Sequence, residues 1–284
     1  MNADSLLVHV VSAGMMLGSV VVGVGIAGSV RMRDLLAPLP SSAAEKFSIR
    51  GFVSRSLHLQ TFIQTLDLLS RDDIHVAFIC TENTNHEEHI RQFLEAGKHV
   101  CVEYPMTLSL VLHEEHIELF TPDFKQLKKD IAGKTLEEGM LHFTGSKFGF
   151  PSFSGIARLT WLVDLFGELT VTAASLVEEK ENKYMKLTAH FLTGQQKPLT
   201  WIEERAPGLG RAKHIDLRFQ DASITELPAG QREPVGLFMQ DLVLFGRKLQ
   251  GEVSAAELQD ERSRILHCLQ LAEHIQQLSE HTQA

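Results

Sequence analysis

Three glycines early in the chain have the spacing of a phosphate-binding turn. Gly23-Val24-Gly25-Ile26-Ala27-Gly28 follows an apolar, β-branched run at 19–22 and precedes a segment, 29–36, that is typical of a helix. In such a turn the first glycine permits a tight bend, the second lets the backbone approach a pyrophosphate, and the third lets helix and strand pack closely. The alternative is a glycine-rich apolar turn without a ligand. The motif predicts a dinucleotide site formed by Gly23, Val24, Gly25, Ala27 and Gly28, with the anion on the first N–H groups of the helix.

The end of the next expected strand, 48–53, indicates which dinucleotide is preferred. An NAD-preferring site usually has Asp or Glu there to hold the ribose 2′-hydroxyl, whereas this chain has Ser54, Arg55 and Ser56. A guanidinium makes charge-assisted, bidentate bonds to phosphate oxygens. Arg55 therefore favours NADPH, with NADH as the second possibility and a solvated loop arginine as the alternative interpretation.

The run His113-Glu114-Glu115-His116 has residue types that could bind a metal. It lacks the i, i+4 histidine spacing of the HExxH zinc motif. In a strand, Glu114 and His116 would share one face, and His113 and Glu115 would share the other. We predict that the two carboxylates line a cleft or bind water, and that the run holds no metal.

The elements that must position these residues alternate along the first half of the chain. Further strands are expected at 75–80 and 99–104, and a helix at 86–96 is closed by Gly97 as its C-cap. Alternating strands and helices of this kind build a right-handed parallel sheet. We therefore expect an α/β fold whose residues 1–120 form an NAD(P)-binding, Rossmann-type domain.

The second half, 121–284, has the pattern of an antiparallel sheet with helices. Strands are expected at 169–177, 184–193, 199–204 and 214–220, with turn residues between them. Ser154 is the expected N-cap of a helix that reaches Phe166 and is closed by Gly167. A last helix with an apolar face is expected from Ser254 to about His281.

Composition bounds the class of protein. A chain of 284 residues suits two domains, and 44% hydrophobic with 22% charged residues is typical of a soluble globular protein. The formal net charge of −9 argues against a nucleic-acid partner. Three scattered cysteines without a CxxC pair favour reduced thiols in the cytoplasm.

One segment does not fit that description. Residues 5–30 contain no Asp, Glu, Lys or Arg and are long enough to span a bilayer. No basic region precedes them, as a signal peptide would require, and the glycine turn accounts for their second half. A membrane anchor is therefore the less favoured alternative.

Two longer motifs resemble a known superfamily. Thr81-Glu82-Asn83-Thr84-Asn85-His86 and the segment 95–105, which contains Glu103-Tyr104-Pro105, resemble the signature of the glucose–fructose oxidoreductase-like superfamily. Most members have Glu-Lys-Pro, with the lysine near the nicotinamide, whereas Glu-Tyr-Pro is similar to the biliverdin reductase A family. The resemblance continues in order through 51–55, 113–119, 148–151, 158–163, 201–204 and 264–269.

The resemblance implies a fold and an activity. The first domain would be a Rossmann-type parallel sheet, and the second an α+β domain with a large, open-faced, mainly antiparallel six-stranded sheet, whose C-terminal helix packs back on the first domain. The activity would be NADPH-dependent reduction of the central methine bridge of biliverdin, a tetrapyrrole, to bilirubin in haem catabolism. A cytoplasmic monomer without nucleic-acid or membrane partners is expected.

The resemblance also implies site residues. Tyr104 would lie beside the nicotinamide, where a reference pKa of ~10 makes it a reluctant acid, and Arg158 would anchor a propionate or relay a proton. Zinc is doubtful because His267 and Cys268 are present but Ser279 replaces a family cysteine. Besides the five residues of the glycine turn, the cofactor contacts are Ser54, Arg55, Ser56, Thr81, Asn83, His86, Glu103 and Tyr104; the catalytic residues are Arg158, Tyr104 and Glu115; the substrate contacts are Arg158, Glu114 and Phe150.

The chain departs from the family in one important place. Pro105 runs almost directly into the expected strand 111–115, where the family has a helix. Adjacent parallel strands need a crossover of about a dozen residues or more. The second strand would therefore leave the sheet or pair antiparallel at its edge, or the chain is a shortened variant with a damaged nucleotide domain. The rival functions are an impaired variant with a regulatory or no enzymatic role, and a sugar or diol dehydrogenase of the same superfamily.

Overall fold

The computed structural model describes residues 15–54, 65–82, 85–103, 113–146 and 152–281. The chain divides into two compact units, Met1–Ile117 with Pro234–Gln259 and Glu118–Glu233 with Asp260–Ala284. This division differs from the expected domains, 1–120 and 121–284, mainly in one later segment that joins the first unit.

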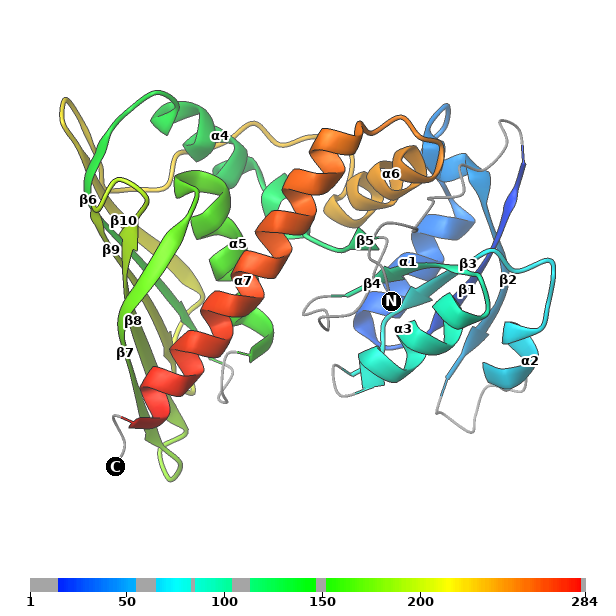
Figure 1. Cartoon of the computed structure of the whole chain (residues 1–284), viewed down its shortest axis with the longest axis horizontal. Coiled ribbons are helices and arrows are strands. Elements are labelled where there is room, and N and C mark those ends of the chain that lie inside the picture. Colours follow the sequence, from blue (N-terminus) through cyan, green and yellow to red (C-terminus); the bar gives the residue numbers. More distant parts are fainter. Residues whose placement is uncertain (1–14, 55–64, 83–84, 104–112, 147–151, 282–284) are drawn as a thin grey trace. The chain divides into compact units, whose positions relative to one another are not determined.

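The first unit is built on a parallel sheet of five strands in the order β2-β1-β3-β4-β5 (Figure 1). The interior strand β1, between β2 and β3, is buried along its whole length, which explains why its sequence is a mainly apolar run instead of an alternating one. The strands are β1 (Leu17–Val22), β2 (Phe47–Val53), β3 (Val76–Ile79), β4 (His99–Val102) and β5 (His113–Glu114).

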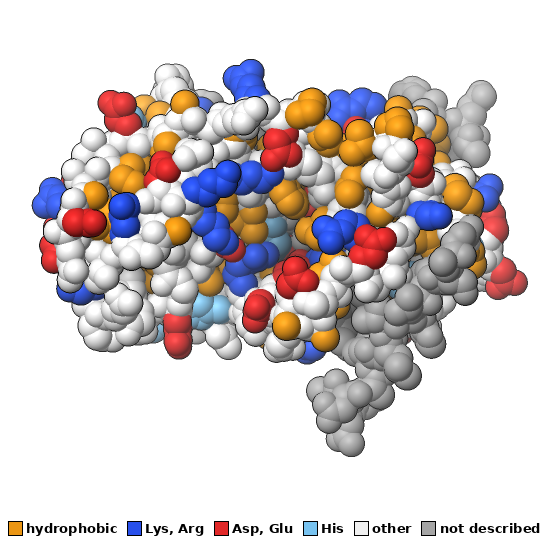
Figure 2. Space-filling model, turned by 90° about the horizontal axis from the view of Figure 1, so that it is seen from above, with side chains coloured by type: hydrophobic (Ala, Val, Ile, Leu, Met, Phe, Trp, Pro, Cys, Tyr) orange, Lys and Arg blue, Asp and Glu red, His pale blue; other side chains and the backbone are white. Residues whose placement is uncertain are grey.

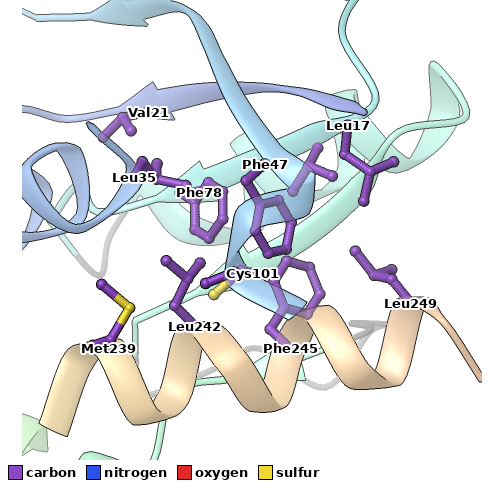
Figure 3. Packing of buried hydrophobic residues seen from close by; sticks show 12 residues of the cluster. Leu17, Val21, Leu35, Phe47, Phe78, Cys101, Met239, Leu242, Phe245 and Leu249 are labelled. Carbon is purple, nitrogen blue, oxygen red and sulfur yellow. The ribbon is translucent and has the colours of Figure 1, made fainter. Parts of the chain in front are cut away.

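Helices cover both faces of this sheet. The helical elements of the unit are α1 (Ile26–Leu36), η1 (Ala43–Lys46), α2 (Thr65–Leu69), α3 (His86–Glu95) and α6 (Leu237–Leu249). One buried cluster joins α1, η1 and α6 to the sheet, and a second joins α2 and α3 to the other face. Figure 3 shows Met239, Leu242, Phe245 and Leu249 of α6 pointing at the sheet residues.

The pairing of β5 corrects one prediction. β5 pairs parallel with β4, with Cys101 opposite His113 and Val102 opposite Glu114, so the strand neither leaves the sheet nor runs antiparallel at its edge. The physical reason is its length. β5 has two residues and pairs with the last two residues of β4, so the parallel pairing involves a short stretch of each strand.

The second unit is built on a six-stranded sheet in the order β11-β10-β6-β9-β8-β7. β6 and β9 pair in parallel and the other neighbouring strands of this sheet pair antiparallel, which confirms the mainly antiparallel sheet. Helices α5 and α7 lie along one face, and the other face is open in Figure 1. The strands are β6 (Leu136–Gly145), β7 (Leu169–Glu179), β8 (Tyr184–Thr193), β9 (Pro198–Arg205), β10 (Ala212–Phe219) and β11 (Ser223–Ile224).

Three helices and one 3₁₀ turn complete the second unit: η3 (Ile117–Phe120), α4 (Pro122–Ile131), α5 (Ser152–Phe166) and α7 (Ala255–His281). α5 begins two residues before Ser154, so Ser154 lies within the first turn and the N-cap prediction is wrong. Gly167 closes the helix as predicted, with a φ of 75°. Ser254 caps α7, because its Oγ accepts from Glu257 N–H while its own N–H donates to Glu257 Oε2.

The C-terminal helix α7 contacts the second unit. His267 Nε2 accepts a hydrogen bond from Leu169 N–H at 3.1 Å, and Arg264 Nη1 lies 3.5 Å from Asp164 Oδ1. The later element that packs on the parallel sheet is α6.

On the face that Figure 2 shows, basic and acidic side chains lie among one another. None of the helices in the described part of the chain combines the length and the apolar character that a membrane span requires.

Candidate functional site

The glycine turn after β1 has a backbone that requires two of its glycines. Gly23 has a φ of 93°, and its N–H donates to Val53 O at 2.9 Å. A Cβ on Gly28 would lie 1.9 Å from Gly23 O. The start of α1 therefore approaches the turn as closely as the sequence predicted, and any side chain at Gly28 would push the helix away.

Gly25 differs from these two because the space beside it is open. It is the N-cap of α1 in an extended conformation, and a Cβ there would meet nothing within 4 Å among the residues that the structure describes. Within that described part of the chain no side chain caps the helix, and the first backbone bond joins Ser29 N–H to Gly25 O at 2.9 Å. The N–H groups before Ser29 are those that a helix leaves for an external acceptor. The turn thus fits an anion such as the pyrophosphate of a dinucleotide.

The strand order places this turn where open α/β sheets bind ligands. The chain leaves β1 for β2 on one side and reaches β3 on the other, so the carboxyl ends of β1 and β3 flank a topological switch point. Cys80 N–H donates to Val22 O at 2.8 Å, and Thr81 Cγ2 lies 2.9 Å from the Cβ position of Gly23. Thr81 therefore lies beside the glycine turn.

Buried histidine supports the loop after β3. His86 is fully buried, and its Nε2 lies 2.9 Å from Thr81 O. The Oγ1 of Thr81 lies 3.3 Å from His89 Nδ1. The His86 ring thus holds the backbone of Thr81 in place. Ser54, another predicted site residue, follows β2 at the same edge of the sheet. Five predicted site residues lie outside the described residues: Arg55, Ser56, Asn83, Tyr104 and Phe150.

Three carboxyl groups surround one buried guanidinium in the first unit. Arg31 of α1 is 1% exposed, and its Nη2 lies 2.7 Å from Glu115 Oε2 and 2.5 Å from Asp241 Oδ2. Its Nε lies 3.8 Å from Glu103 Oε1. Glu103 follows β4 at the edge where the glycine turn lies, whereas Asp241 comes from α6. Sequence reasoning assigned no role to Arg31 or Asp241.

Two of the three carboxyl groups respond differently to burial. Burial opposes ionisation of Asp241, but Arg31 and His113 hold the pKa of this carboxyl well below its usual range. Burial raises the pKa of Glu115 to about 10, helped by the neighbouring Glu103, although Arg31 lies close by. These surroundings favour the neutral form of Glu115 and the ionised form of Asp241.

His113 connects this group to a second cation. Its Nε2 lies 3.0 Å from Asp241 Oδ1, and Lys248 Nζ lies 2.6 Å from its Nδ1. The predicted alternation of faces is observed, since His113 and Glu115 reach this cluster while Glu114 Oε1 lies 3.2 Å from His116 Nε2. Glu114 is itself buried.

Cys101, His113 and Asp241 bring possible metal-ligand atoms within 4.8 Å of one another. Burial raises the pKa of the Cys101 thiol well above its usual value, so the thiolate that a metal needs is disfavoured. Asp241 and His113 already contact Arg31 and Lys248. We therefore assign these groups to an ion cluster and identify no metal ligands among them.

Arg158 of α5 is the main buried cation of the second unit. Its guanidinium carbon lies 4.1 Å over the ring of Phe143, and its Nε lies 3.4 Å from Glu203 Oε2. Nη1 lies 3.9 Å from Glu118 Oε2, too far for a hydrogen bond, and has no other partner among the described residues. A buried donor of this kind suits an anionic ligand.

Further basic side chains gather around the same acids. Arg205 pairs with Glu203, and Lys213 Nζ lies 3.9 Å from Glu118 Oε2. Arg211 Nη2 lies 3.9 Å from Glu118 Oε1. Sequence reasoning missed these three cations, although the signal was present as three basic residues within the nine positions of 205–213.

The three residues considered for a zinc site, His267, Cys268 and Ser279, each contact other groups of the protein. His267 accepts from Leu169 N–H, and burial lowers its pKa. The buried Cys268 lies 4.0 Å from Thr160 Oγ1, and Ser279 Oγ donates to Gln276 O. Nothing in these contacts favours zinc at this position.

Comparison with known proteins agrees with this geometry. Residues 17–127 match the family model described as "Oxidoreductase family, NAD-binding Rossmann fold", and residues 124–231 match "Biliverdin reductase, catalytic". The fold and the glycine turn define an oxidoreductase with an NAD-binding Rossmann domain.

Two curated relatives identify the family. Biliverdin reductase A of Mus musculus is 49% identical over 286 residues, which cover 92% of this chain and 95% of the relative. Biliverdin reductase A of Homo sapiens is also 49% identical, over 91% of this chain and 95% of its own length. The chain belongs to the biliverdin reductase family.

A solved structure extends the comparison to the fold. Biliverdin reductase from Synechocystis sp. PCC 6803, in complex with biliverdin and NADP+, aligns with a TM-score of 0.72 at 18% identity. The alignment covers 93% of this chain and 99% of that one. The two chains share their architecture of a Rossmann-type unit and a larger sheet unit.

Proposed function

We propose that this protein reduces biliverdin with NADPH. A hydride passes to the central methine bridge, a proton is added to a pyrrole nitrogen, and the product is bilirubin. The observation that carries the proposal is the open, uncapped turn at Gly25 in a chain of the biliverdin reductase family. The cofactor, when bound, supplies the hydride, and the residues of the chain bind and orient the two reactants.

In the first unit, the proposed cofactor contacts lie along one edge of the sheet. The amides after Gly25 hold the pyrophosphate, Thr81 lines the switch point, and Glu103 stands at the end of β4. Arg55 is proposed to bind the 2′-phosphate and Tyr104 to orient the nicotinamide. Both assignments rest on the sequence, because these residues lie outside the described ones.

In the second unit, Arg158 and its basic neighbours suit a substrate with two propionates. Arg158 Nη1 is buried without a hydrogen-bond partner among the residues described, and Arg205, Arg211 and Lys213 lie around the same acids. Arginine recognises carboxylates through two parallel N–H bonds. We propose Arg158 as the propionate anchor or proton relay.

The rival functions have less support. The missing crossover suggested a damaged nucleotide domain. However, β5 pairs in parallel with β4, and Gly23 has the positive φ that the tight glycine turn requires. Tyr104 in place of lysine argues against a sugar or diol dehydrogenase. The three cysteines are free, in keeping with a cytoplasmic protein, and a monomer remains a prediction from the resemblance.

Turnover tests the proposal directly. Purified protein with biliverdin and NADPH should replace the biliverdin absorption spectrum with that of bilirubin, and consume one NADPH for each bilirubin formed. A reaction without NADPH is the control. Tight NADPH binding without any turnover would favour a regulatory variant, and oxidation of sugars in place of biliverdin reduction would favour the dehydrogenase.

A further inference from the structure

A buried carboxylate of the second unit lies on the covered face of the large sheet. Glu203 of β9 is 0% exposed, and it shares its face of the strand with Leu199 and Trp201, which are also buried. Helix α5 covers this face, since a Cβ on Gly155 would lie 3.5 Å from the Trp201 ring. An ionised carboxyl group in such a place is costly unless cations and hydrogen-bond donors surround it.

Three donors meet the Glu203 carboxylate. Arg158 Nε and Trp201 Nε1 each lie 3.4 Å from its Oε2, and Arg205 Nη2 donates to its Oε1. Each oxygen of Glu203 thus contacts one arginine. The three side chains come from α5 and β9, so the carboxylate connects the helix to the sheet beneath it.

Each of the two arginines is also fixed on a second side. The guanidinium carbon of Arg158 lies 4.1 Å from the centroid of the Phe143 ring, and Phe143 is the partner of Glu203 in the register of β6 and β9. Arg205 lies against the backbone of Gly145, where a Cβ would be 2.4 Å from its Nη1. Because Gly145 has no side chain, it leaves the space that the Arg205 guanidinium occupies.

The contacts with Glu203 leave binding capacity on the arginines. Arg158 Nη1 is buried and has no hydrogen-bond partner among the described residues, since Glu118 Oε2 is 3.9 Å away. Two arginines on one carboxylate leave one positive charge in excess, and Glu118 is itself shared with Arg211 and Lys213. A buried donor beside an excess positive charge suits a carboxylate of a ligand.

We propose that Glu203 is a positioning residue for the proposed reaction: it fixes Arg158 and Arg205 as a pair of cations that receives a carboxylate of the substrate. This inference rests on the proposed function, in which Arg158 anchors a propionate, and it adds Arg205 to that anchor. Glu203 acts through the two arginines and, being fully buried, does not touch the substrate. A purely structural ion pair would instead affect stability and leave the preference for a carboxylate unchanged.

The first test is Glu203→Gln, which keeps the shape of the side chain and removes its charge. Glutamine has one acceptor oxygen, so it can hold one arginine while its amide group faces the other. We expect the affinity for biliverdin to fall about tenfold, the effect of losing a hydrogen bond to a charged group. The affinity for biliverdin with esterified propionates should change by no more than about twofold, because the ester has no carboxylate to lose. Quenching of the fluorescence of Trp161 and Trp201, the two tryptophans of the chain, measures both affinities.

A second variant, Gly145→Ala, moves Arg205 without removing a charge. Its new methyl group would overlap Arg205 Nη1, and the flexible end of the arginine would have to move away from Glu203. The free energy of unfolding, measured by denaturant titration, should therefore stay within about 0.5 kcal/mol of the parent. The affinity for biliverdin should fall about threefold or more, and that for the ester should not. If Glu203→Gln does not fold, this variant alone decides the question.

The matched control is Glu138→Gln, which makes the same substitution at an exposed carboxylate of β6 whose partner is Arg218 at 3.3 Å. It should bind both ligands as the parent does. A parental preference for biliverdin over the ester in either folded test variant would overturn the inference, and so would a parent that binds the two ligands equally. The titrations need no NADPH, so a failure to form bilirubin in the turnover assay counts against the proposed function alone.

Discussion

Arg31 shows why some important residues have no signature in the sequence. An arginine on the first helix after a glycine turn is normally solvent-exposed, yet here it contacts Glu115 and Asp241, which lie 84 and 210 positions away. Nothing local to Arg31 indicates these partners. The glycine turn could be predicted because the role of each glycine depends on backbone geometry within six residues, whereas the contacts of Arg31 depend on segments far apart in the chain.

The proposed anchor role of Arg158 predicts a specific response to the substrate's charge. Arg158→Ala should lower kcat/KM for biliverdin by about tenfold to a hundredfold, the effect of one or two charge-assisted hydrogen bonds. A biliverdin whose propionates are esterified should be a poor substrate for the parent. The variant should no longer distinguish it from biliverdin, as steady-state kinetics with both substrates will show.

The matched control for that experiment is Arg264→Ala, which removes another partly buried arginine of the same unit. Its partner is Asp164, at 3.5 Å. We expect this variant to distinguish the two substrates as the parent does. If Arg158→Ala discriminates as strongly as the parent, the propionate assignment is wrong.

At the scale of elements, the strands with regular apolar patterns were predicted, whereas strand β6 and helix α6 were not. β8 was predicted with its observed bounds, because its residues alternate cleanly between the buried and the partly exposed face. β6 lies in the middle of the sheet, between β10 and β9, but Glu137, Glu138 and Gly139 interrupt its alternation. A Cβ at Gly139 would lie 2.6 Å from Leu199 Cδ1, so any larger residue there would have to displace the Leu199 side chain.

Helix α6 was missed for a related reason. Two of its buried residues, Asp241 and Lys248, are charged, and a charged position on a helix usually faces solvent. Its role in the first unit could not be inferred, because it follows the whole sheet of the second unit in the sequence. Only the tertiary packing shows that it completes the core under β1, β3 and β4.

The packing of α6 predicts a large effect on stability. Phe245 is fully buried, stacks on Phe47 with ring centroids 5.7 Å apart and meets the edge of Phe78 at 5.8 Å. Phe245→Ala should lower the free energy of unfolding by about 3–5 kcal/mol, measured by denaturant titration. Leu36→Ala, at a position 72% exposed, should change it by no more than about 0.5 kcal/mol. A similarly small loss in Phe245→Ala would show that α6 is not part of this core.

At the scale of the whole molecule, the two units divide the proposed reaction between them. The first carries the glycine turn and the buried Arg31 with its carboxyl partners, and the second carries Arg158 with its basic neighbours. The sequence predicted the two kinds of sheet, because parallel and antiparallel strands differ in their apolar patterns. It did not predict that the segment Pro234–Gln259 returns to the first unit, since that assignment depends on packing between segments far apart in the chain.

The most direct measurement for the account as a whole is the affinity for NADPH of a Gly25→Ala variant, followed by nicotinamide fluorescence. The new methyl group meets no atom of the described residues within 4 Å but occupies the space proposed for the pyrophosphate, so affinity should fall about tenfold or more, equivalent to ~1.4 kcal/mol. Gly236→Ala is the matched control, because Gly236 is the N-cap of α6 with equally open space around it. The account predicts parental affinity for Gly236→Ala and weakened binding for Gly25→Ala, with similar stability in both. Equal, undiminished NADPH binding by the two variants would contradict it.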